Sequence, residues 1–198
     1  AASLGITERP ACSRSKRLRV SRWSGDRPQL EPVPPSALAS PGMGTLSTTS
    51  TRRIIIIGAG PGGICAAIGL RQAGYDDIVV LDKAEGAGGT WWHNSYPGCA
   101  CDVPTHLYSF SFELNTGWSR PYATQPEIQR YMEHVVDTYG IRPMLRLGTG
   151  VKGCYWDDEC LVWRVLTDSG EELEADVVVS AIGMFNELNW PDIPGLDD

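Results

Sequence analysis

The stretch RIIIIGAGPGG, from Arg53 to Gly63, decides the fold of this 198-residue chain. Four consecutive isoleucines are typical of a strand that is buried on both faces, as in a parallel sheet. Glycines follow the isoleucines directly, which indicates a tight turn where the strand ends.

The residues after this stretch complete a recognisable unit. GGICAAIGLRQAG carries small and apolar side chains at helical spacing, and Gly74 is placed as the helix stop. DIVVLD, from Asp77 to Asp82, is a second apolar run that ends on an acid. Strand, glycine turn, helix and strand within about 30 residues predict a βαβ unit, and therefore an α/β, Rossmann-like fold.

The glycines of the turn also predict chemistry. Gly58, Gly60 and Gly63 fit the pattern G-x-G-x-x-G, in which the first glycine permits the turn, the second admits a pyrophosphate and the third lets helix and strand pack closely. The phosphates then meet the helix N-terminus, where N–H groups point outward. Asp82 ends the second strand, where a carboxylate accepts hydrogen bonds from ribose hydroxyls and disfavours a 2′-phosphate. We expect FAD or NAD, rather than NADP, at this turn.

The rest of the chain departs from a plain repetition of βαβ units. TQPEIQRYMEHVVDTYG, from Thr124 to Gly140, predicts a helix that begins with a capping box of Thr124 and Glu127. Short β-rich runs follow, separated by turn signals at 157–159 and 168–170. We expect an antiparallel β-meander that returns to the parallel sheet through residues 177–182.

GGTWWHNSYPGCACD, from Gly88 to Asp102, places two adjacent tryptophans between glycines and a Tyr-Pro-Gly turn. The Gly, Asn, Ser and Pro residues predict a loop without a regular element. A disulfide between Cys99 and Cys101 would close a strained ring, so we expect no redox pair here. The six cysteines show no CxxC pair and no zinc-binding spacing, which predicts reduced thiols and no metal site.

The same loop carries a family resemblance. Gly88-Gly89-Thr90-Trp91, then Asn94-x-Tyr96-Pro97-Gly98 and Asp102, resemble the signature of class B flavoprotein monooxygenases of the Baeyer-Villiger type, in their N-terminal FAD-binding portion. DVPTHLYSFSFE and WSRPYATQPEIQRY are most similar to the hydroxyacetophenone and cyclohexanone monooxygenases. The resemblance covers residues 53–198 and implies a flavoprotein with two dinucleotide domains, whose FAD-binding domain holds an inserted meander. His93 and Ala100 depart from the family pattern, which often has an aromatic residue and an arginine there.

The resemblance implies roles for particular residues. Asp102 would lie near the flavin and orient an active-site arginine, which makes it the catalytic candidate; a turn acid that caps nearby N–H groups is the alternative. The cofactor-binding candidates, from the glycine motif and the resemblance together, are Gly58, Gly60, Gly62, Gly63, Asp82, Gly89, Thr90, Trp91, Trp92, Asp102, Tyr108 and Val151.

The resemblance also implies the cofactors FAD and NADPH. NADPH would reduce FAD, and the reduced flavin would capture O2 as a C4a-peroxide that oxygenates a small ketone, sulfide or amine. The family's linker signature, second glycine fingerprint and catalytic arginine do not occur in these residues, so we expect a fragment that ends before the NADPH domain and is inactive alone. An N- or S-oxygenating enzyme, another FAD/NAD(P) oxidoreductase of this architecture, and a nucleotide-binding module without catalysis remain alternatives.

Charge divides the chain into two parts. The net charge is −7, yet residues 1–51 hold seven basic and three acidic side chains and six prolines. We expect residues 1–51 to form a disordered extension, with Met43 a possible natural start and a transit peptide the alternative. Residues 52–198 would form the FAD-binding domain. Their acidic excess and the absence of a long apolar run predict a cytoplasmic protein that binds neither nucleic acid nor membrane.

Overall fold

The computed structural model describes residues 52–184 and 191–195, so the expectation of a disordered extension at 1–51 lies outside the described residues. A central parallel sheet has the strand order β3-β2-β1-β7, and a second, antiparallel sheet has the order β4-β5-β6. The elements run in the order β1 (Ile54–Ile57), α1 (Pro61–Gln72), β2 (Ile78–Leu81), α2 (Thr90–His93), η2 (Thr105–Leu107), α3 (Gln125–Thr138), η3 (Arg142–Met144), β3 (Leu145–Arg146), β4 (Val151–Asp157), β5 (Val162–Thr167), β6 (Glu172–Ala175) and β7 (Val177–Ser180).

The predicted βαβ unit is confirmed. β1 pairs in parallel with β2 on one side and with β7 on the other, with Ile54 opposite both Ile78 and Val177. The helix α1 ends before Gly74, which adopts a φ of 91° that favours glycine. The predicted meander is confirmed as well, because β4, β5 and β6 pair antiparallel before the chain returns to the parallel sheet at β7.

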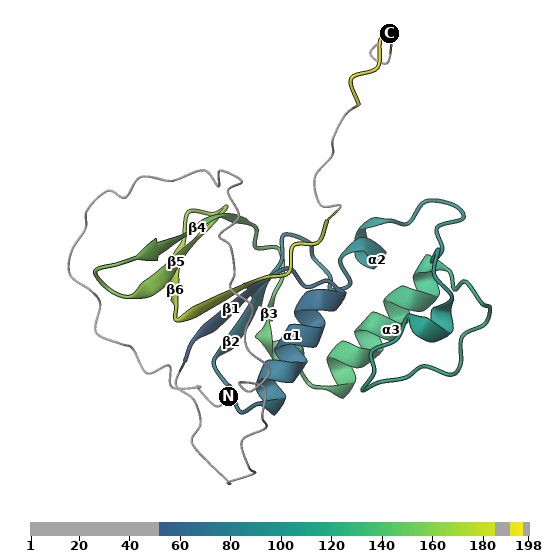
Figure 1. Cartoon of the computed structure of the whole chain (residues 1–198), viewed down its shortest axis with the longest axis horizontal. Helices are drawn as coiled ribbons and strands as arrows, with labels where there is room; N and C mark the ends of the chain where they lie inside the picture. Colours follow the sequence, from purple (N-terminus) through teal and green to yellow (C-terminus); the bar gives the residue numbers. More distant parts are fainter. Residues whose placement is uncertain (1–51, 185–190, 196–198) are drawn as a thin grey trace, which may run out of the picture.

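Two apolar cores lie on opposite faces of the parallel sheet (Figure 1). Ile54 and Ile56 point to the face that α1 and α3 cover, whereas Ile55 points to the face that the antiparallel sheet covers. Successive side chains of a strand alternate between the faces, so an uninterrupted isoleucine run supplies both cores at once. This three-layer arrangement leaves the carboxyl ends of β1 and β2 free to form a site.

The helix α3 is confirmed, but its predicted capping box is wrong. Thr124 makes no side-chain capping hydrogen bond. The Glu127 carboxylate instead accepts hydrogen bonds from the backbone N–H of Ser119 at 2.7 Å and from its hydroxyl at 2.9 Å. The carboxylate that the capping box needs is therefore engaged by the chain that leads into the helix. The predicted apolar face is buried throughout, at Ile128, Tyr131, Met132, Val135 and Val136.

The prediction that the tryptophan loop holds no regular element is also wrong, because Thr90–His93 form the one-turn helix α2. The breaking residues flank this turn and do not lie inside it. Asn94 ends the turn, since its backbone N–H and its side-chain amide both donate to the Thr90 carbonyl.

Candidate functional site

The glycine turn connects β1 to α1 and requires glycine at two positions. Gly58 has a φ of 107°, and a Cβ there would lie 2.3 Å from the Ala181 carbonyl oxygen. A Cβ on Gly63 would lie 1.8 Å from the Gly58 carbonyl oxygen. The turn and the close packing of helix on strand that the motif predicts are therefore present.

The N-terminus of α1 is open to an anion. Its N-cap residue is Gly60, which offers no side chain to the first-turn N–H groups, and no acidic residue lies in the first turn. The first amides of a helix have no partner within the helix and carry its positive dipole end. Gly62 is exposed at this position and Pro61 opens the helix. The turn therefore presents N–H donors where a phosphate group could bind.

Asp82 joins the tip of β2 to the glycine turn. One carboxylate oxygen accepts from the Ala59 N–H at 2.6 Å, and the other accepts from the Ala84 N–H at 2.8 Å. A carboxylate offers about four acceptor positions, so these two bonds leave capacity for a further donor such as a hydroxyl. The predicted acid is thus fixed directly beside the predicted phosphate site.

The segment that precedes β4 lies against the same strand tip. Thr149 donates its N–H to the Asp82 carbonyl at 2.7 Å, and Gly148 donates to the Ala84 carbonyl at 2.8 Å. Val151, two residues after Thr149, begins β4 and is half-buried against the core of the antiparallel sheet. The structure thus brings the candidate Val151 to the Asp82 side of the site.

The tryptophan loop rests on the glycine turn. Gly88 donates its N–H to the Ala59 carbonyl at 2.9 Å. Gly89 has a φ of 57°, and a Cβ there would lie 2.8 Å from the Gly60 Cα. The two glycine segments, about 30 residues apart in sequence, therefore meet backbone to backbone. Thr90 is exposed at the start of α2, next to this contact.

Trp91 and Tyr108 form a pair behind the turn. The buried Trp91 indole donates to the Tyr108 hydroxyl at 2.9 Å, and the two rings meet edge to face with centroids 5.6 Å apart. Burial raises the pKa of the Tyr108 phenol, and the indole hydrogen bond opposes that shift. Trp92 differs, because 42% of it is exposed and its ring covers Gly86.

An apolar cavity of about 270 Å³ lies next to this pair and reaches the start of α1. Its lining residues are Pro61, Leu107, Tyr108, Ser109, Phe110, Tyr131 and Met132. Apolar cavities with a few polar groups are typical of small-molecule sites. Asp102 is exposed, and His93 is exposed in the last turn of α2. The structure therefore leaves the catalytic candidate Asp102 on the surface of the described residues.

Sequence reasoning missed two glutamines of α3 that hold the tryptophan loop. The Gln125 side chain donates to the Trp91 carbonyl, and the Gln129 side chain donates to the Ala87 carbonyl at 2.7 Å. Their spacing of four residues puts both on one side of α3. The only signal available in the sequence was two polar residues that border the apolar face of a helix.

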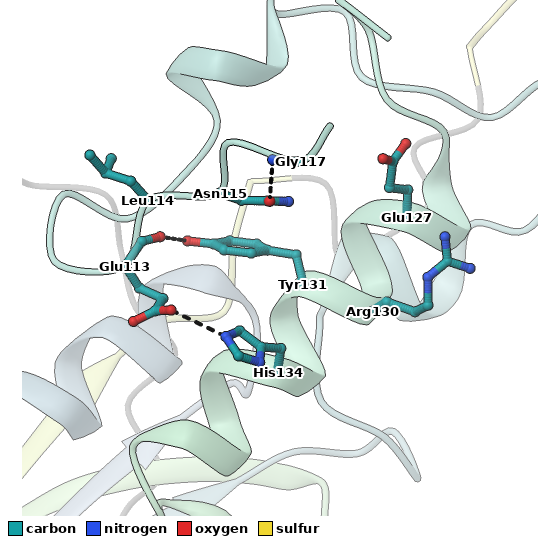
Figure 2. Close-up of a pocket in the computed structure, with 8 residues that line it drawn as sticks. All are labelled: Glu113, Leu114, Asn115, Gly117, Glu127, Arg130, Tyr131 and His134. Atoms are coloured by element: carbon teal, nitrogen blue, oxygen red, sulfur yellow. Dashed lines mark hydrogen bonds and ion pairs between the residues drawn. The ribbon is translucent and has the colours of Figure 1, made fainter. Parts of the chain in front are cut away.

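A second cavity, of about 390 Å³, lies on the outer side of α3 (Figure 2). Its lining residues are Glu113, Leu114, Asn115, Gly117, Glu127, Arg130, Tyr131 and His134. Two of its polar groups are engaged with each other, since the Glu113 carboxylate and the His134 imidazole are hydrogen-bonded at 3.1 Å. None of the sequence-predicted site residues lines this cavity.

The cysteines and the charged groups give no sign of a metal site in the described part of the chain. Cys99 and Cys101 are buried and carry free thiols. Within residues 52–184 and 191–195, no three His, Cys, Asp or Glu side chains are grouped to hold a metal ion. No helix of these residues combines the length and the apolar character needed to cross a membrane.

Comparisons with known proteins agree with this geometry. A family model described as an NAD(P)-binding Rossmann-like domain matches residues 56–134. A Baeyer-Villiger monooxygenase of Streptomyces coelicolor is 54% identical over 145 residues, which cover 73% of this chain and 28% of the relative. A Baeyer-Villiger monooxygenase of Pseudomonas aeruginosa is 41% identical over 146 residues, covering 74% of this chain and 28% of the relative.

Solved structures give the same relationship. Cyclohexanone monooxygenase from Rhodococcus sp. Phi1, bound to NADP+, superposes with a TM-score of 0.68 at 44% identity, covering 74% of this chain and 28% of that one. The chain thus spans a little over a quarter of the length of these relatives. The Rossmann-like fold and the resemblance to Baeyer-Villiger monooxygenases, both predicted from the motifs, are confirmed.

Proposed function

We propose, from this relationship to the Baeyer-Villiger monooxygenases, that the chain is the FAD-binding part of an NADPH- and O2-dependent flavin monooxygenase. The observation that carries the proposal is the contact between the two glycine segments. The turn of Gly58 to Gly63 and the loop of Gly88 to Trp91 lie against each other through Gly60 and Gly89. A nucleotide motif and a motif typical of flavin monooxygenases therefore lie in contact, which supports a single FAD site between them.

The described residues fit FAD in three respects. The α1 N-terminus offers free first-turn amides without a capping side chain or an acid, which suits a pyrophosphate. The Asp82 carboxylate retains acceptor capacity at the strand tip, which suits ribose hydroxyls. The apolar cavity beside Trp91 and Tyr108 supplies the surroundings that an aromatic ring system needs.

Each candidate then has a role in the proposal. Gly62 and Gly63 would donate to the pyrophosphate, Asp82 would bind the adenosine ribose, and Val151 would contact the adenine. Thr90, Trp91 and Trp92 would line the flavin side, with Tyr108 fixed by the Trp91 indole. Asp102 would support catalysis by orienting an arginine from another part of the protein.

The bound flavin would supply electron transfer from NADPH to O2 and oxygen transfer to the substrate. The chain's own contribution is to hold the cofactor and to exclude water from it. Trp91 is 6% exposed and Tyr108 keeps a protonated phenol, so both present apolar surface with their polar atoms satisfied by each other. Such a pair keeps water away from one side of a site.

We propose a small ketone as the substrate, because the relatives carry the names of Baeyer-Villiger and cyclohexanone monooxygenases. A sulfide or amine substrate is the second candidate within the same reaction class. A domain organisation in which residues 52–198 form one FAD-binding domain, and a cytoplasmic location, belong to the same proposal.

A titration of the purified chain with FAD tests the proposal. Flavin fluorescence should show saturable binding, and Trp91→Phe should weaken it about tenfold because the indole hydrogen bond to Tyr108 is lost. Trp156→Phe is the matched control, since Trp156 lies in β4 on the antiparallel sheet. Equal affinities for all three proteins would refute the flavin role of the tryptophan loop.

A further inference from the structure

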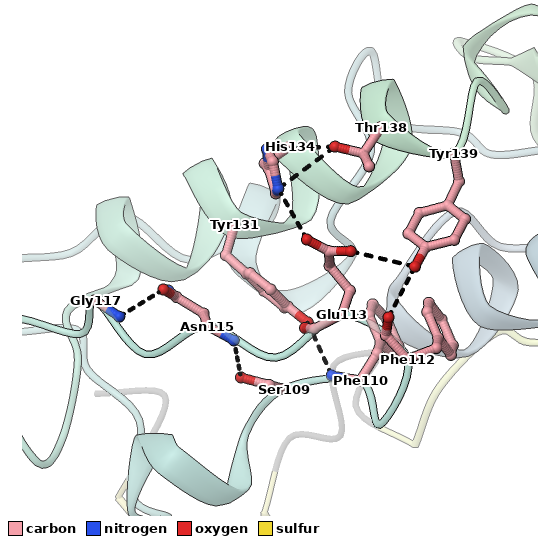
Figure 3. A network of polar contacts seen from close by, with 10 residues as sticks. All are labelled: Ser109, Phe110, Phe112, Glu113, Asn115, Gly117, Tyr131, His134, Thr138 and Tyr139. Carbon is pink, nitrogen blue, oxygen red and sulfur yellow. Dashed lines mark hydrogen bonds and ion pairs between the residues drawn. The ribbon is translucent and has the colours of Figure 1, made fainter.

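Tyr131 of α3 forms hydrogen bonds to the backbone of the segment that follows Tyr108 (Figure 3). Its hydroxyl accepts a hydrogen bond from the Phe110 N–H at 2.8 Å and donates one to the Glu113 carbonyl at 2.6 Å. Phe110 and Glu113 also form an isolated antiparallel bridge. One side chain thus satisfies two backbone groups at the neck of this small loop.

The ring of Tyr131 is held on several sides. Its centroid lies 5.4 Å from that of Trp118 and 6.1 Å from that of Phe110. The ring contributes to the lining of both cavities, so it forms a wall between them. Tyr131 is buried, and its hydroxyl therefore occupies a fixed position relative to α3.

A second tyrosine, the residue that caps the C-terminus of α3, fixes the far end of the same segment. Tyr139 donates its hydroxyl to the Phe112 carbonyl at 2.8 Å, and its ring meets the Phe112 ring edge to face at 5.2 Å. Phe112 in turn stacks on Phe110 with centroids 5.1 Å apart. Tyr139 therefore acts on the outer part of the loop, whereas Tyr131 acts two residues from Tyr108.

We propose that Tyr131 is a positioning residue for the flavin side of the site, through Phe110, Tyr108 and the Trp91 indole. The inference rests on the proposed function, because it assigns Trp91 and Tyr108 to the FAD site. The path is short and continuous. Tyr131 holds the N–H of Phe110, Phe110 fixes the backbone that carries Tyr108, and the Tyr108 hydroxyl accepts the Trp91 indole N–H.

The hydroxyl of Tyr131, rather than its ring, carries this role. Tyr131→Phe keeps the packing against Trp118 and Phe110 but leaves the Phe110 N–H and the Glu113 carbonyl without their partner. Burial raises the pKa of the Tyr131 phenol, so the hydroxyl keeps its proton and its donor function across neutral pH.

The test follows the Trp91 indole N–H in the 198-residue chain by hydrogen exchange in NMR spectra, without any flavin. In Tyr131→Phe we expect a shifted indole resonance and at least about a tenfold loss of protection, because Tyr108 is released. Tyr75→Phe is the matched control, since Tyr75 also packs partly buried against the same core, in the segment between α1 and β2. It should leave the indole unchanged.

FAD affinity gives the second readout. Tyr131→Phe and Trp91→Phe should each weaken FAD binding about tenfold, and the double variant should lose about tenfold rather than a hundredfold, because both act through Tyr108. An unchanged indole signal in a folded but less stable Tyr131→Phe, or additive losses of affinity, would reduce Tyr131 to a structural residue. Absence of saturable FAD binding to the wild-type chain would instead refute the proposed function, and the indole exchange would still decide the positioning role.

Discussion

Gly63 and Gly69 lie on the same helix, α1, but stand in opposite surroundings. A Cβ on Gly63 would collide with the Gly58 carbonyl at 1.8 Å, while a Cβ on Gly69 would meet nothing within 4 Å. Gly63, which belongs to the glycine motif, therefore marks a close approach of helix to turn, whereas Gly69, outside the motif, has room for a methyl group. The two residues make a matched pair for testing what the motif requires.

We expect Gly63→Ala to destabilise the fold by about 3 kcal/mol, because β1 and α1 must move apart to admit the methyl group. Gly69→Ala should stabilise it by about 0.5–1 kcal/mol, since alanine loses less conformational entropy than glycine inside a helix. Chemical denaturation followed by circular dichroism measures both. Similar effects of the two substitutions would mean that α1 does not pack on the turn as described.

At the scale of elements, the apolar pattern predicted more than the polar pattern did. The isoleucines of β1 and the apolar face of α3 are buried, and the sequence pattern predicted both. The capping box at Thr124 failed because Ser119, five residues earlier, binds Glu127. Such competition depends on where a preceding loop runs, and hydrophobic periodicity does not record that.

The site could be predicted only in part, because some of its contacts also depend on the path of a distant loop. The glycine turn and Asp82 follow from local sequence, because the strand and its turn place them. The hold of α3 on the tryptophan loop, through Gln125 and Gln129, joins residues more than 30 positions apart and has no local signature. The helix α2 was missed because it is only one turn long and is flanked directly by Gly89 and Asn94, which are residue types that favour loops.

The turn between β4 and β5 supplies a prediction about pH. The Asp157 carboxylate accepts from the N–H groups of Glu159 and Cys160 and from the Arg164 guanidinium at 2.8 Å, and the Arg164 hydrogen bond contributes most to lowering its pKa. A carboxyl whose pKa is lower in the folded state than in the unfolded state contributes stability above the unfolded pKa of about 4. That contribution disappears as the pH falls through the folded pKa.

Asp157→Asn should therefore lower the melting temperature at pH 7 and have progressively less effect below about pH 4, because the carboxyl of the unfolded wild-type chain binds a proton first and the folded carboxyl follows at lower pH. Asp158→Asn, at the exposed neighbouring position, should change little at any pH. Thermal denaturation from about pH 3 to pH 7 provides the measurement. A difference between Asp157→Asn and wild type that stays constant over this range would contradict the assignment.

At the scale of the whole molecule, three layers place the proposed site at one edge. The helices and the antiparallel sheet cover the two faces of the parallel sheet, and the carboxyl ends of β1 and β2 carry the glycine turn and Asp82 (Figure 1). Ligands of open α/β sheets bind at this end of the strands. Gly148 and Thr149, which precede the meander, lie against the tip of β2, and Val151 at the start of β4 is the candidate that the meander itself supplies.

The 198 residues alone should show no NADPH consumption with a ketone substrate, because the second glycine fingerprint and the arginine of the related family do not occur in them. Absorbance at the NADPH band, with FAD and cyclohexanone added, measures this directly. Ketone-dependent NADPH oxidation by these residues would contradict the proposal that they bind FAD but lack the NADPH site.

The central claim is that the glycine turn and the tryptophan loop form one FAD site, and an amide chemical-shift map of the chain titrated with FAD tests it most directly. We predict saturable shifts at Gly60, Gly62, Gly63 and Gly89, at the amide of Asp82 and at the Trp91 indole, with the outer strands of the meander unaffected. Shifts confined to the glycine turn, or an absence of saturable shifts at both segments, would contradict the account.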